Sequence, residues 1–404
     1  MSKNILIINE YAGSPSYGMT FRHYYLAKEF NKKGYETTII SASYSHFLKK
    51  IPEMNGETFK DEKVDGVNFI WIKVIKYTKS FDKKRALKWL EFTSKLFFIN
   101  KKLKSRPDVI ICSTTELFAI LPAYYLSKKY KAKLVFEVRD IWPLTLVKIG
   151  NFSEKNIFIR MMSWLERFSL RKSDIIVSNL SNYTKHIKSL GIDRSAVWVS
   201  NGIDLDEMKN IEELPFDLNE LIPKNKFIVG YTGKLGVSNA ILYLLESAKI
   251  LKENKDIFFV IVGDGQEKEN LKNFSKNLNN IIFIDSIKKK QIQSMLSLFN
   301  ICYIGWKKEN IYNYGVSANK IFDYMYSGKP ILQSIDIDSD IVQKSNCGLC
   351  VESENSYAIS EGIIKLFNMS EEERKQLGNN GKEYVLNNFT YDKLSDKFIS
   401  ILGN

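Results

Sequence analysis

The sequence predicts an α/β protein with two doubly wound, Rossmann-like parallel-sheet domains that face each other across a cleft. Short strands rich in Ile, Val and Phe alternate with helical segments in both halves of the 404-residue chain. Such strands are typical of buried parallel sheets with crossover helices. The chain is also long enough for two hydrophobic cores. We expect an N-terminal domain over 1–198, a C-terminal domain over 199–387, and a last helix near 388–404 that is able to pack back on the first.

Charge is distributed unevenly between the two expected domains. Residues 1–200 carry 35 Lys and Arg against 18 Asp and Glu, a net charge of +17. Residues 201–404 carry 24 against 28, a net charge of −4. The first half is therefore suited to an anionic partner. No secretory signal is visible and the longest apolar run is too short to span a bilayer, so we expect a soluble or peripheral protein.

The first half offers two candidate loops, each directly after a predicted strand. In NEYAGSPSYGMT, Gly13 and Gly18 follow the first strand, and Arg22 lies on the helix that comes next. In FEVRDIWP, Arg139 and Asp140 end a later strand. Ligands of parallel sheets bind beyond the carboxyl ends of the strands, where charged groups suit substrate binding or proton handling. A salt bridge within the second loop is the alternative for that pair.

Residues 73–106 break the alternation of strands and helices. This segment holds 12 basic residues against Asp82 and Glu91. Leu87 and Leu90 begin a wide apolar face that has aromatic residues beside it. A basic amphipathic helix of this kind can lie on an anionic bilayer. The alternative is a helix packed on the sheet with a solvated basic rim.

The second half contains two glycine loops at strand ends. In YTGKLGVSNA, Gly233 and Gly236 allow a ligand to approach the backbone closely, and Lys234 supplies a cation for a diphosphate. Asn239 lies near the start of the following helix. The other loop begins at Gly263, but it lacks the third glycine of a dinucleotide fingerprint, so we do not expect a nicotinamide site.

The stretch 315–332 carries the strongest chemical signal. Its helix has Lys320 in the first turn and Asp323 one turn later. Free backbone N–H groups, the helix dipole and a lysine together bind a phosphate or diphosphate, and the carboxylate is spaced to hold two ribose hydroxyls. An ordinary amphipathic helix is the alternative. The small-residue loop before the helix consists of Gly315, Ser317, Ala318 and Asn319.

Taken in order, these loops resemble the retaining glycosyltransferases of family 4, which have the two-domain GT-B fold. GKLGVSNA is similar to the family's phosphate loop, with Lys234 in place of an Arg and Asn239 in place of a Lys. VSNGID, at 199–204, is similar to the hinge signature. Two acidic residues eight positions apart are usual in the family, and here Gly315 and Asp323 occupy those places. FEVRDIWP and SANKIFDYM most resemble the subgroup that builds bacterial capsule and O-antigen repeat units.

The resemblance implies transfer of a sugar, often an N-acetylated amino sugar, from a UDP-sugar with retention and without a metal. The acceptor would be a polyprenyl-diphosphate-linked sugar at the inner face of the cell membrane, reached from the cytoplasm through the basic segment 73–106. Catalytic roles fall to Lys234, Lys320, Arg139 and Asp140, the lysines by neutralising the leaving diphosphate. Acceptor-binding roles fall to Tyr17, Gly18, Arg22 and Trp142. Donor-binding roles fall to Gly233, Gly236, Asn239, Gly263, Ser286, Ile287, Gly315, Ser317, Ala318, Asn319 and Asp323, with Asp323 on the ribose and the backbone at Ser286 and Ile287 on the uracil.

Two other functions stay open on the sequence alone. A UDP-sugar 2-epimerase shares this architecture, although the basic amphipathic segment would then have no purpose. The basic half could instead bind nucleic acid, but no recognition motif supports that. The three histidines lack the spacing of metal ligands, and we expect the acidic pair Asp336 and Asp338 to form a surface loop.

Overall fold

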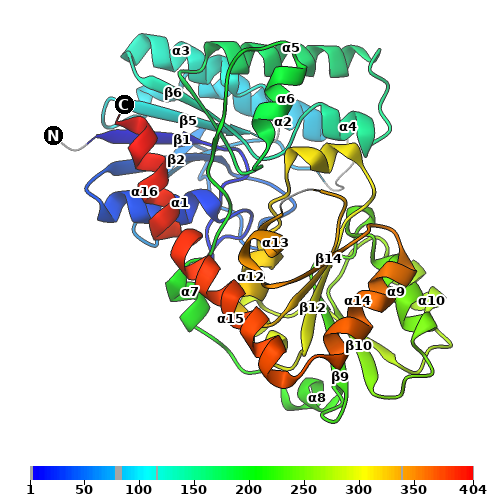
Figure 1. Cartoon of the computed structure of the whole chain (residues 1–404). Helices are drawn as coiled ribbons and strands as arrows, with labels where there is room; N and C mark the ends of the chain where they lie inside the picture. The colour runs from blue at the N-terminus through cyan, green and yellow to red at the C-terminus, as the bar shows by residue number, and fades with distance from the viewer. Residues whose placement is uncertain (1–2, 78–83, 115–116, 338–339, 404) are drawn as a thin grey trace. The chain divides into compact units, whose positions relative to one another are not determined.

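The computed structural model describes residues 3–77, 84–114, 117–337 and 340–403. Its contacts divide the chain into two compact units (Figure 1). Unit 1 comprises Met1–Ser200 and Tyr391–Asn404, and unit 2 comprises Asn201–Thr390. The boundary expected from the sequence, after residue 198, lies two residues before this division. The expected alternation of strands and helices is confirmed in both units.

Unit 1 is built on an eight-stranded sheet that is parallel except at one edge. The antiparallel edge is a hairpin whose turn, Asp65–Gly66, takes positive φ angles of 48° and 88°, the backbone that a two-residue hairpin requires. In sheet order the strands are β3 (Phe59–Val64), β4 (Val67–Ile72), β2 (Glu36–Ala42), β1 (Asn4–Ile8), β5 (Val109–Thr114), β6 (Lys133–Val138), β7 (Ile175–Ser178) and β8 (Val197–Trp198).

Helices cover both faces of the sheet in unit 1 (Figure 1). On one face, α1 packs against α16, the last helix of the chain. On the other face, α2 packs against α3 and α3 packs against α5. The helices of unit 1 are α1 (Arg22–Lys32), α2 (Lys84–Leu96), η1 (Ile99–Lys101), α3 (Ile120–Tyr130), α4 (Leu144–Lys148), α5 (Ile157–Lys172), α6 (Tyr183–Ser189) and α16 (Tyr391–Leu402).

Unit 2 is built on a six-stranded, fully parallel sheet. Its strands in sheet order are β11 (Ile281–Ile284), β10 (Ile257–Val262), β9 (Phe227–Thr232), β12 (Ile301–Gly305), β13 (Ile331–Ser334) and β14 (Gly348–Val351). The chain winds from β9 outward to β11, returns to β12 beside β9, and then winds the other way. The strand order therefore reverses between β9 and β12, which is where doubly wound sheets open a crevice for ligands.

The helices of unit 2 surround a core of apolar residues that are almost wholly buried. Val229, Phe259 and Ile301, for example, are 0% exposed. The helices are α7 (Leu205–Lys209), α8 (Phe216–Glu220), η2 (Val237–Asn239), α9 (Ile241–Ile250), α10 (Lys268–Phe274), η3 (Lys289–Gln291), α11 (Ile292–Ser297), η4 (Asn310–Tyr314), α12 (Asn319–Ser327), α13 (Ile341–Ser345), α14 (Ser356–Asn368) and α15 (Glu371–Asn388).

The segment 73–106, expected to present a basic apolar face, is partly buried in unit 1. Residues 78–83, which include Asp82, lie outside the described residues. Trp89 and Phe92 of α2 pack into the unit, whereas Leu87 and Leu90 are exposed. The alternative, a helix packed on the sheet, therefore accounts for one face of α2 and leaves the other face apolar.

Lys88 of α2 is not part of a basic surface, because it forms a buried ion pair. Its Nζ lies 2.5 Å from Glu10 Oε1, and both side chains are 0% exposed. The ammonium also lies 4.4 Å from the ring centroid of Tyr11. Burial raises the pKa of Glu10, which Lys88 opposes. Removing one partner of such a pair leaves an uncompensated charge in the core.

We predict that Lys88→Met lowers the free energy of unfolding by about 3–5 kcal/mol, because Glu10 loses its cation. The double variant Glu10→Gln/Lys88→Met should recover much of that loss. Urea denaturation followed by circular dichroism measures both values. Lys84→Met, on the exposed side of the same helix, is the control and should change stability by at most about 0.5 kcal/mol. Equal stability of Lys88→Met and the control would contradict the buried pair.

Candidate functional site

Lys320 lies at the point of unit 2 where the strand order reverses. Its Nζ donates to Tyr231 Oη at 2.6 Å and to Asn239 Oδ1 at 2.8 Å. The ammonium is also 4.3 Å from the centroid of the Tyr231 ring. The structure thus brings together Lys320 of α12 and Asn239 of the loop after β9, two residues that are 81 positions apart in sequence.

The Lys320 ammonium has no carboxylate to balance it among the contacts of the described residues. Tyr231 and Asn239 are neutral, and burial lowers the pKa of Lys320 to about 7. A desolvated cation held by neutral groups favours the arrival of an anion, because the anion restores the charge balance that water would otherwise supply. The geometry therefore suits a phosphate group.

The glycine loop at 233–239 is braced from within. Tyr231 Oη donates to the carbonyl of Lys234 at 2.7 Å, and Asn239 Nδ2 donates to the same carbonyl at 3.0 Å. Tyr231 therefore links the loop backbone to Lys320. The side chain of Lys234 is exposed. The sequence did not single out Tyr231, although an aromatic residue directly before the Gly233 turn was the available signal.

Gly233 and Gly263 let two loops approach each other in a way that a side chain would block. Both glycines have φ of +148°, which L side chains rarely adopt. A Cβ on Gly263 would lie 1.8 Å from the carbonyl oxygen of Gly233, and one on Gly233 would lie 2.9 Å from Lys320 Nζ. A Cβ on Gly236 would meet nothing closer than 3.9 Å. Gly263 is thus required by its backbone contact and Gly233 by its positive φ, whereas Gly236 is required by neither.

The amino end of α12 is held in place by the segment expected to act as a hinge. Asn201 Nδ2 donates to the carbonyl of Ser317 at 2.7 Å. Ala318 is the N-cap residue, with extended backbone and no side-chain cap. The amino end of a helix without a side-chain cap presents N–H groups and the positive end of the dipole. Ser317, Ala318 and Asn319 therefore form an anion-receptive turn that ends at Lys320.

The backbone conformation at position 315 explains why glycine stands there in place of the acidic residue that is usual in the resembled family. Its φ is +107°, in a region that favours glycine strongly over other residues. A glutamate at this position would be strained, so the loss of the acidic side chain and the local turn belong together. The predicted element is present, but its first position offers backbone alone.

Asp323 does not present a free carboxylate to the site. Lys289 Nζ donates to its Oδ1 at 2.6 Å and to its Oδ2 at 2.8 Å. Asp323 raises the pKa of Lys289 against the opposing effect of burial. The sequence analysis did not identify Lys289, which stands in a run of three lysines, 288–290. The predicted ribose ligand is therefore already one half of an ion pair.

The loop after β11 approaches the Gly263 loop. The backbone N–H of Gly263 donates to the carbonyl of Ile284 at 3.0 Å. Ser286 and Ile287 follow, and the chain then reaches Lys289 and its bond to Asp323. The loops after β9, β10 and β11 and the start of α12 thus meet at one edge of the sheet.

Unit 1 places the predicted acceptor residues less favourably. Arg22 is 3% exposed, and its Nη2 donates to Glu137 Oε1 at 2.9 Å and to the carbonyl of Val199 at 2.8 Å. His23 Nε2 lies 2.7 Å from Glu137 Oε2. Arg22 and His23 keep the pKa of Glu137 well below its ordinary value despite burial. Arg22 thus links α1 to the carboxyl ends of β6 and β8, so we do not include it in the proposed acceptor site.

Tyr17 is also engaged inside the unit. Its Oη donates to Glu62 Oε1 at 2.6 Å, and Trp71 Nε1 donates to the other oxygen of Glu62 at 2.8 Å. Burial, with Glu62 contributing, raises the pKa of Tyr17 to about 12. Gly18, with φ of +90°, packs against the backbone of Phe47 and Lys49. These two positions shape the loop after β1 rather than offering a free side chain.

The loop after β6 is more open to a ligand. Asp140 is bonded within its own loop, to Thr145 Oγ1 at 2.6 Å and to Trp142 Nε1 at 3.1 Å. Arg139 contacts Thr20 Oγ1 only at 3.5 Å, and its buried Nε has no partner among the described residues. Of the predicted residues in unit 1, Arg139 has the guanidinium with the weakest ties to protein.

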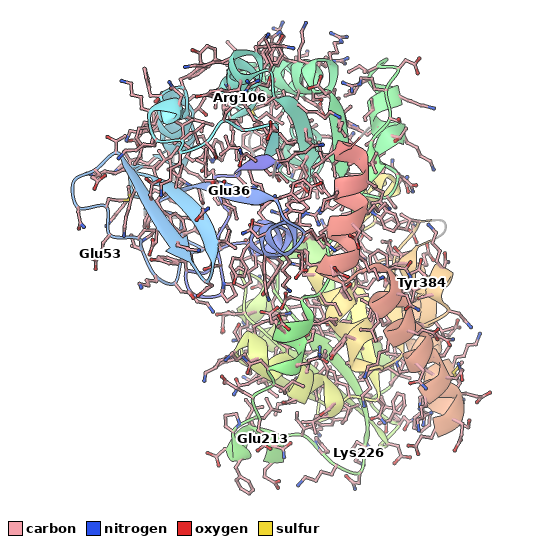
Figure 2. All side chains as sticks on the ribbon, turned by 90° about the vertical axis from the view of Figure 1, so that its left-hand side faces the viewer. Glu36, Glu53, Arg106, Glu213, Lys226 and Tyr384 are labelled. Atoms are coloured by element: carbon pink, nitrogen blue, oxygen red, sulfur yellow. The ribbon has the colours of Figure 1, made fainter. Side chains whose placement is uncertain are left out.

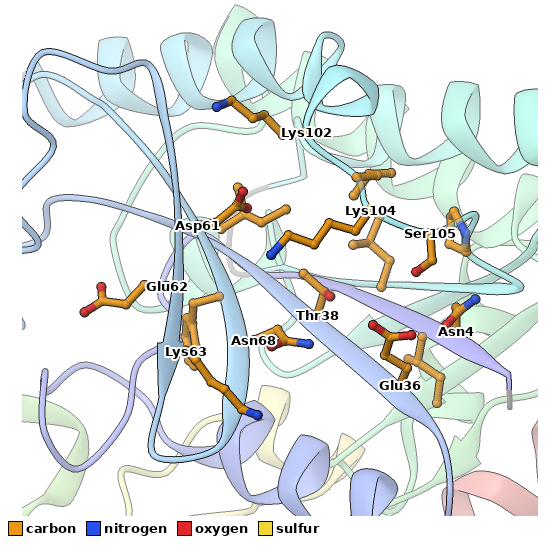
Figure 3. Close-up of a pocket in the computed structure, with 16 residues that line it drawn as sticks. Asn4, Glu36, Thr38, Asp61, Glu62, Lys63, Asn68, Lys102, Lys104 and Ser105 are labelled. Carbon is orange, nitrogen blue, oxygen red and sulfur yellow. The ribbon is translucent and has the colours of Figure 1, made fainter.

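A hollow of about 220 Å³ in unit 1 is lined by none of the predicted site residues, although Glu62, the partner of Tyr17, is on its wall (Figure 3). It is lined at the amino ends of the parallel strands by Asn4 and Glu36, with Asp61 and Lys104 nearby. Glu36 and Arg106 mark the same edge in Figure 2. The mixed charges of its walls point to no ligand class. Over the described ranges, no group of three or more His, Cys, Asp or Glu side chains is placed to hold a metal ion. Asp336 is bonded to Ser353, and Asp338 lies outside those ranges.

Two family models match the chain and together span most of it. Residues 18–207 match Glycosyltransferase Family 4, and residues 215–384 match Glycosyl transferases group 1. The chain is a family 4 glycosyltransferase. The resemblance predicted from the loops is therefore confirmed.

Curated relatives of this glycosyltransferase are distant in sequence. An uncharacterized glycosyltransferase of Methanocaldococcus jannaschii, MJ1178, is 25% identical over 228 residues, which cover 56% of this chain and 58% of that protein. The putative colanic acid biosynthesis glycosyl transferase WcaI of Escherichia coli is 21% identical and covers 82% of this chain and 84% of its own. An E. coli UDP-Gal:alpha-D-GlcNAc-diphosphoundecaprenol alpha-1,3-galactosyltransferase is 24% identical, over 60% of this chain and 64% of its own.

Solved structures confirm the GT-B fold. Sucrose-phosphate synthase from Thermosynechococcus elongatus gives a TM-score of 0.74 at 13% identity, covering 99% of this chain and 98% of that one. Anabaena Alr3699/HepE, solved in complex with UDP, gives 0.68 at 13% identity and covers 100% of both chains. At these identities the likeness concerns the fold alone.

We predict that Gly263→Ala disturbs the site, because its Cβ would push the Gly233 carbonyl away from β10. We expect a stability loss of about 1–3 kcal/mol, as for other overpacked positions, together with weaker binding of UDP. Calorimetric titration with UDP and thermal unfolding measure the two effects. Gly236→Ala, in the same pair of loops but with open space around it, should change neither. Equal behaviour of the two variants would refute the close approach of the loops.

Proposed function

We propose that this glycosyltransferase moves a sugar from a UDP-sugar, with retention, to a lipid-diphosphate-linked saccharide in bacterial surface polysaccharide synthesis. The sugar is of the N-acetylated amino class. The observation that carries the proposal is the desolvated Lys320 ammonium, bonded to Tyr231 and Asn239 at the switch point of unit 2. The alternative UDP-sugar 2-epimerase would use the same nucleotide but no acceptor.

The diphosphate of the donor occupies the turn at the amino end of α12. Lys320 meets one phosphate, the amides of Ser317, Ala318 and Asn319 meet the other, and the exposed Lys234 closes over both. These groups stabilise the negative charge that grows on the diphosphate as the bond to the sugar breaks. Three sources of positive potential perform this role without a metal ion, which is why we propose metal-independent transfer.

The nucleoside lies toward Asp323 and the loop after β11. The Asp323 carboxylate accepts from the ribose hydroxyls while Lys289 holds it in place from the other side. The backbone at Ser286 and Ile287 pairs with the uracil, and Gly263 keeps its loop against the Gly233 loop beside the nucleotide. The name of the distant galactosyltransferase, which includes a UDP-sugar, supports this nucleotide.

Retention follows from the absence of a second nucleophile in the proposed mechanism. The departing phosphate accepts the proton of the acceptor hydroxyl, and that hydroxyl attacks the same face of the sugar that the diphosphate leaves. Gly315 takes the place of a side chain that would contact the sugar, so backbone groups read its hydroxyls. The proposal therefore names a class of sugar, the N-acetylated amino sugars, and no single member of it.

The acceptor binds unit 1 at the carboxyl ends of β1 and β6. Arg139 attracts its diphosphate, Trp142 packs on its sugar, and Asp140 orients that indole. The name of the same relative includes a diphosphoundecaprenol acceptor, which supports a lipid-linked substrate. No helix of the described residues is long and apolar enough to cross a membrane. We propose a peripheral site on the inner membrane face, with the exposed residues of the segment 73–106 in contact with anionic lipid.

A donor panel tests the proposed reaction. UDP-N-acetylglucosamine, UDP-N-acetylgalactosamine, UDP-glucose and UDP-galactose are each incubated with the enzyme and a synthetic lipid-diphosphate sugar, and products are followed by mass spectrometry and anomeric NMR. We expect one acetamido donor to give an acceptor one sugar larger, with the anomeric configuration retained. Epimerised donor in the absence of acceptor would overturn the proposal in favour of the epimerase.

We predict that Lys320→Ala weakens UDP binding about 10- to 100-fold, since a hydrogen bond to a charged group contributes about 1.5–3 kcal/mol. Lys234→Ala should cost less, because an exposed cation is screened by water. Lys329→Ala is the matched control. Lys329 is on the same stretch, burial also lowers its pKa, and its Nζ bonds to Ser297 rather than to the glycine loops. Unchanged UDP affinity in Lys320→Ala would refute the site assignment.

A further inference from the structure

Helix α5 carries an exposed apolar stripe on its outer side. Ile157 is 84% exposed, Met161 is 41% exposed and Trp164 is 56% exposed. Their spacing of i, i+4 and i+7 places them on one face of the helix. The opposite face holds the buried residues Ile159, Met162, Leu165, Glu166, Ser169 and Leu170, which pack toward the sheet. Helix α5 is thus apolar on two sides, and only one of them packs into the hydrophobic core of unit 1.

Basic side chains flank this stripe. Arg160 and Arg171 are exposed on one side of it, and Lys172 is exposed on the other. Glu166, the acidic residue of α5, points inward and bonds to His186 at 2.7 Å. Lys155, just before the helix, is exposed as well. The outer face of α5 is therefore apolar along its centre and positive along its margins.

The stripe continues across the neighbouring helices. Trp164 stacks on Phe168, with ring centroids 5.5 Å apart, and Phe168 meets Tyr124 of α3 at 5.3 Å. On the same helix, Tyr125 is 46% exposed and meets Phe97, which follows α2, at 6.0 Å. Figure 1 shows α3 and α5 side by side in the outer layer of unit 1. The apolar surface thus extends from α5 to α3 and to the residue that follows α2.

We infer that the outer face of α5 inserts into an anionic bilayer, with Ile157, Met161 and Trp164 at the level of the acyl boundary. A helix in the membrane interface buries an apolar face while Lys and Arg at its margins meet anionic headgroups, and an indole is favoured at that depth. The net charge of +17 on residues 1–200 favours the same partner. This surface goes beyond the proposed sugar transfer, and Phe97 joins it to the contact proposed for the segment 73–106.

The test uses the full chain and sonicated vesicles of phosphatidylcholine with or without 30% phosphatidylglycerol, with binding measured by co-sedimentation. We expect Ile157→Gln/Met161→Gln/Trp164→Gln to lower the vesicle partition coefficient about tenfold or more. A matched control replaces exposed apolar residues of unit 2: Leu242→Gln/Phe274→Gln/Tyr357→Gln. The control should bind like the wild type. Undiminished binding of the α5 variant would overturn the inference.

Two further measurements separate the bilayer from other occupants. Brominated lipids should quench the fluorescence of the wild type more strongly than that of Trp164→Phe, because the indole at 164 reaches the acyl chains. Sedimentation velocity should give the same mass for the wild type and the α5 variant. A wild-type dimer that dissociates in the variant would overturn the inference in favour of a second copy. The wild type and the α5 variant should bind UDP with the same affinity. A wild type that binds no UDP would contradict the proposed function and leave the inference about α5 unaffected.

Discussion

The proposed donor site depends on one lysine ammonium that neutral groups hold in a desolvated place. Lys320 comes from the first turn of α12, and the groups that hold it, Tyr231 and Asn239, belong to β9 and the loop that follows it. Three other features of the site support that arrangement. The absence of a side chain at Gly233 gives the ammonium its room, Gly263 allows the second loop to support the first, and Asn201 fixes the turn that leads into the helix. The result is a cation whose charge is favoured by an arriving phosphate.

Unit 1 uses its buried charges in the opposite way. The Arg22–Glu137–His23 network and the Glu10–Lys88 pair are internally balanced, so they hold elements together and offer little to a ligand. The contrast gives a physical criterion for telling a binding lysine from a structural one. A buried cation with a carboxylate beside it is already neutralised, whereas Lys320 is not. Arg139 lies between these two cases, since its guanidinium contacts a hydroxyl at 3.5 Å while the charges of Glu137 and Asp140 also act on it.

The sequence predicted the fold well, and it identified candidate donor loops, because both follow from local patterns. Buried apolar strands indicate a parallel sheet, and glycines after strands indicate loops that a ligand can approach. It predicted the ion-pair and hydrogen-bond partners of individual side chains poorly, since those partners come from residues distant in the chain. Arg22 looked like an acceptor ligand until Glu137, 115 residues away, was found beside it. Lys88 looked like part of a basic surface until Glu10 was found beneath it. Asp323 lies on the predicted helix, but its carboxylate is bonded to Lys289, a member of a lysine run that the sequence analysis did not single out.

The central claim is that Lys320 becomes charged when a diphosphate arrives, and proton uptake measures it directly. Burial lowers its pKa to about 7 in the free enzyme, so at pH 8 the amine is mostly neutral. A bound diphosphate raises that pKa, so binding takes up a proton above pH 7, and UDP affinity falls as pH rises. Titration calorimetry at pH 8, in buffers of different ionisation enthalpy, counts the protons. Subtracting the Lys320→Gln variant removes the nucleotide's own titration. We predict a difference close to one proton at pH 8 and close to none at pH 5.5, and equal uptake by the two proteins at both pH values would contradict the account.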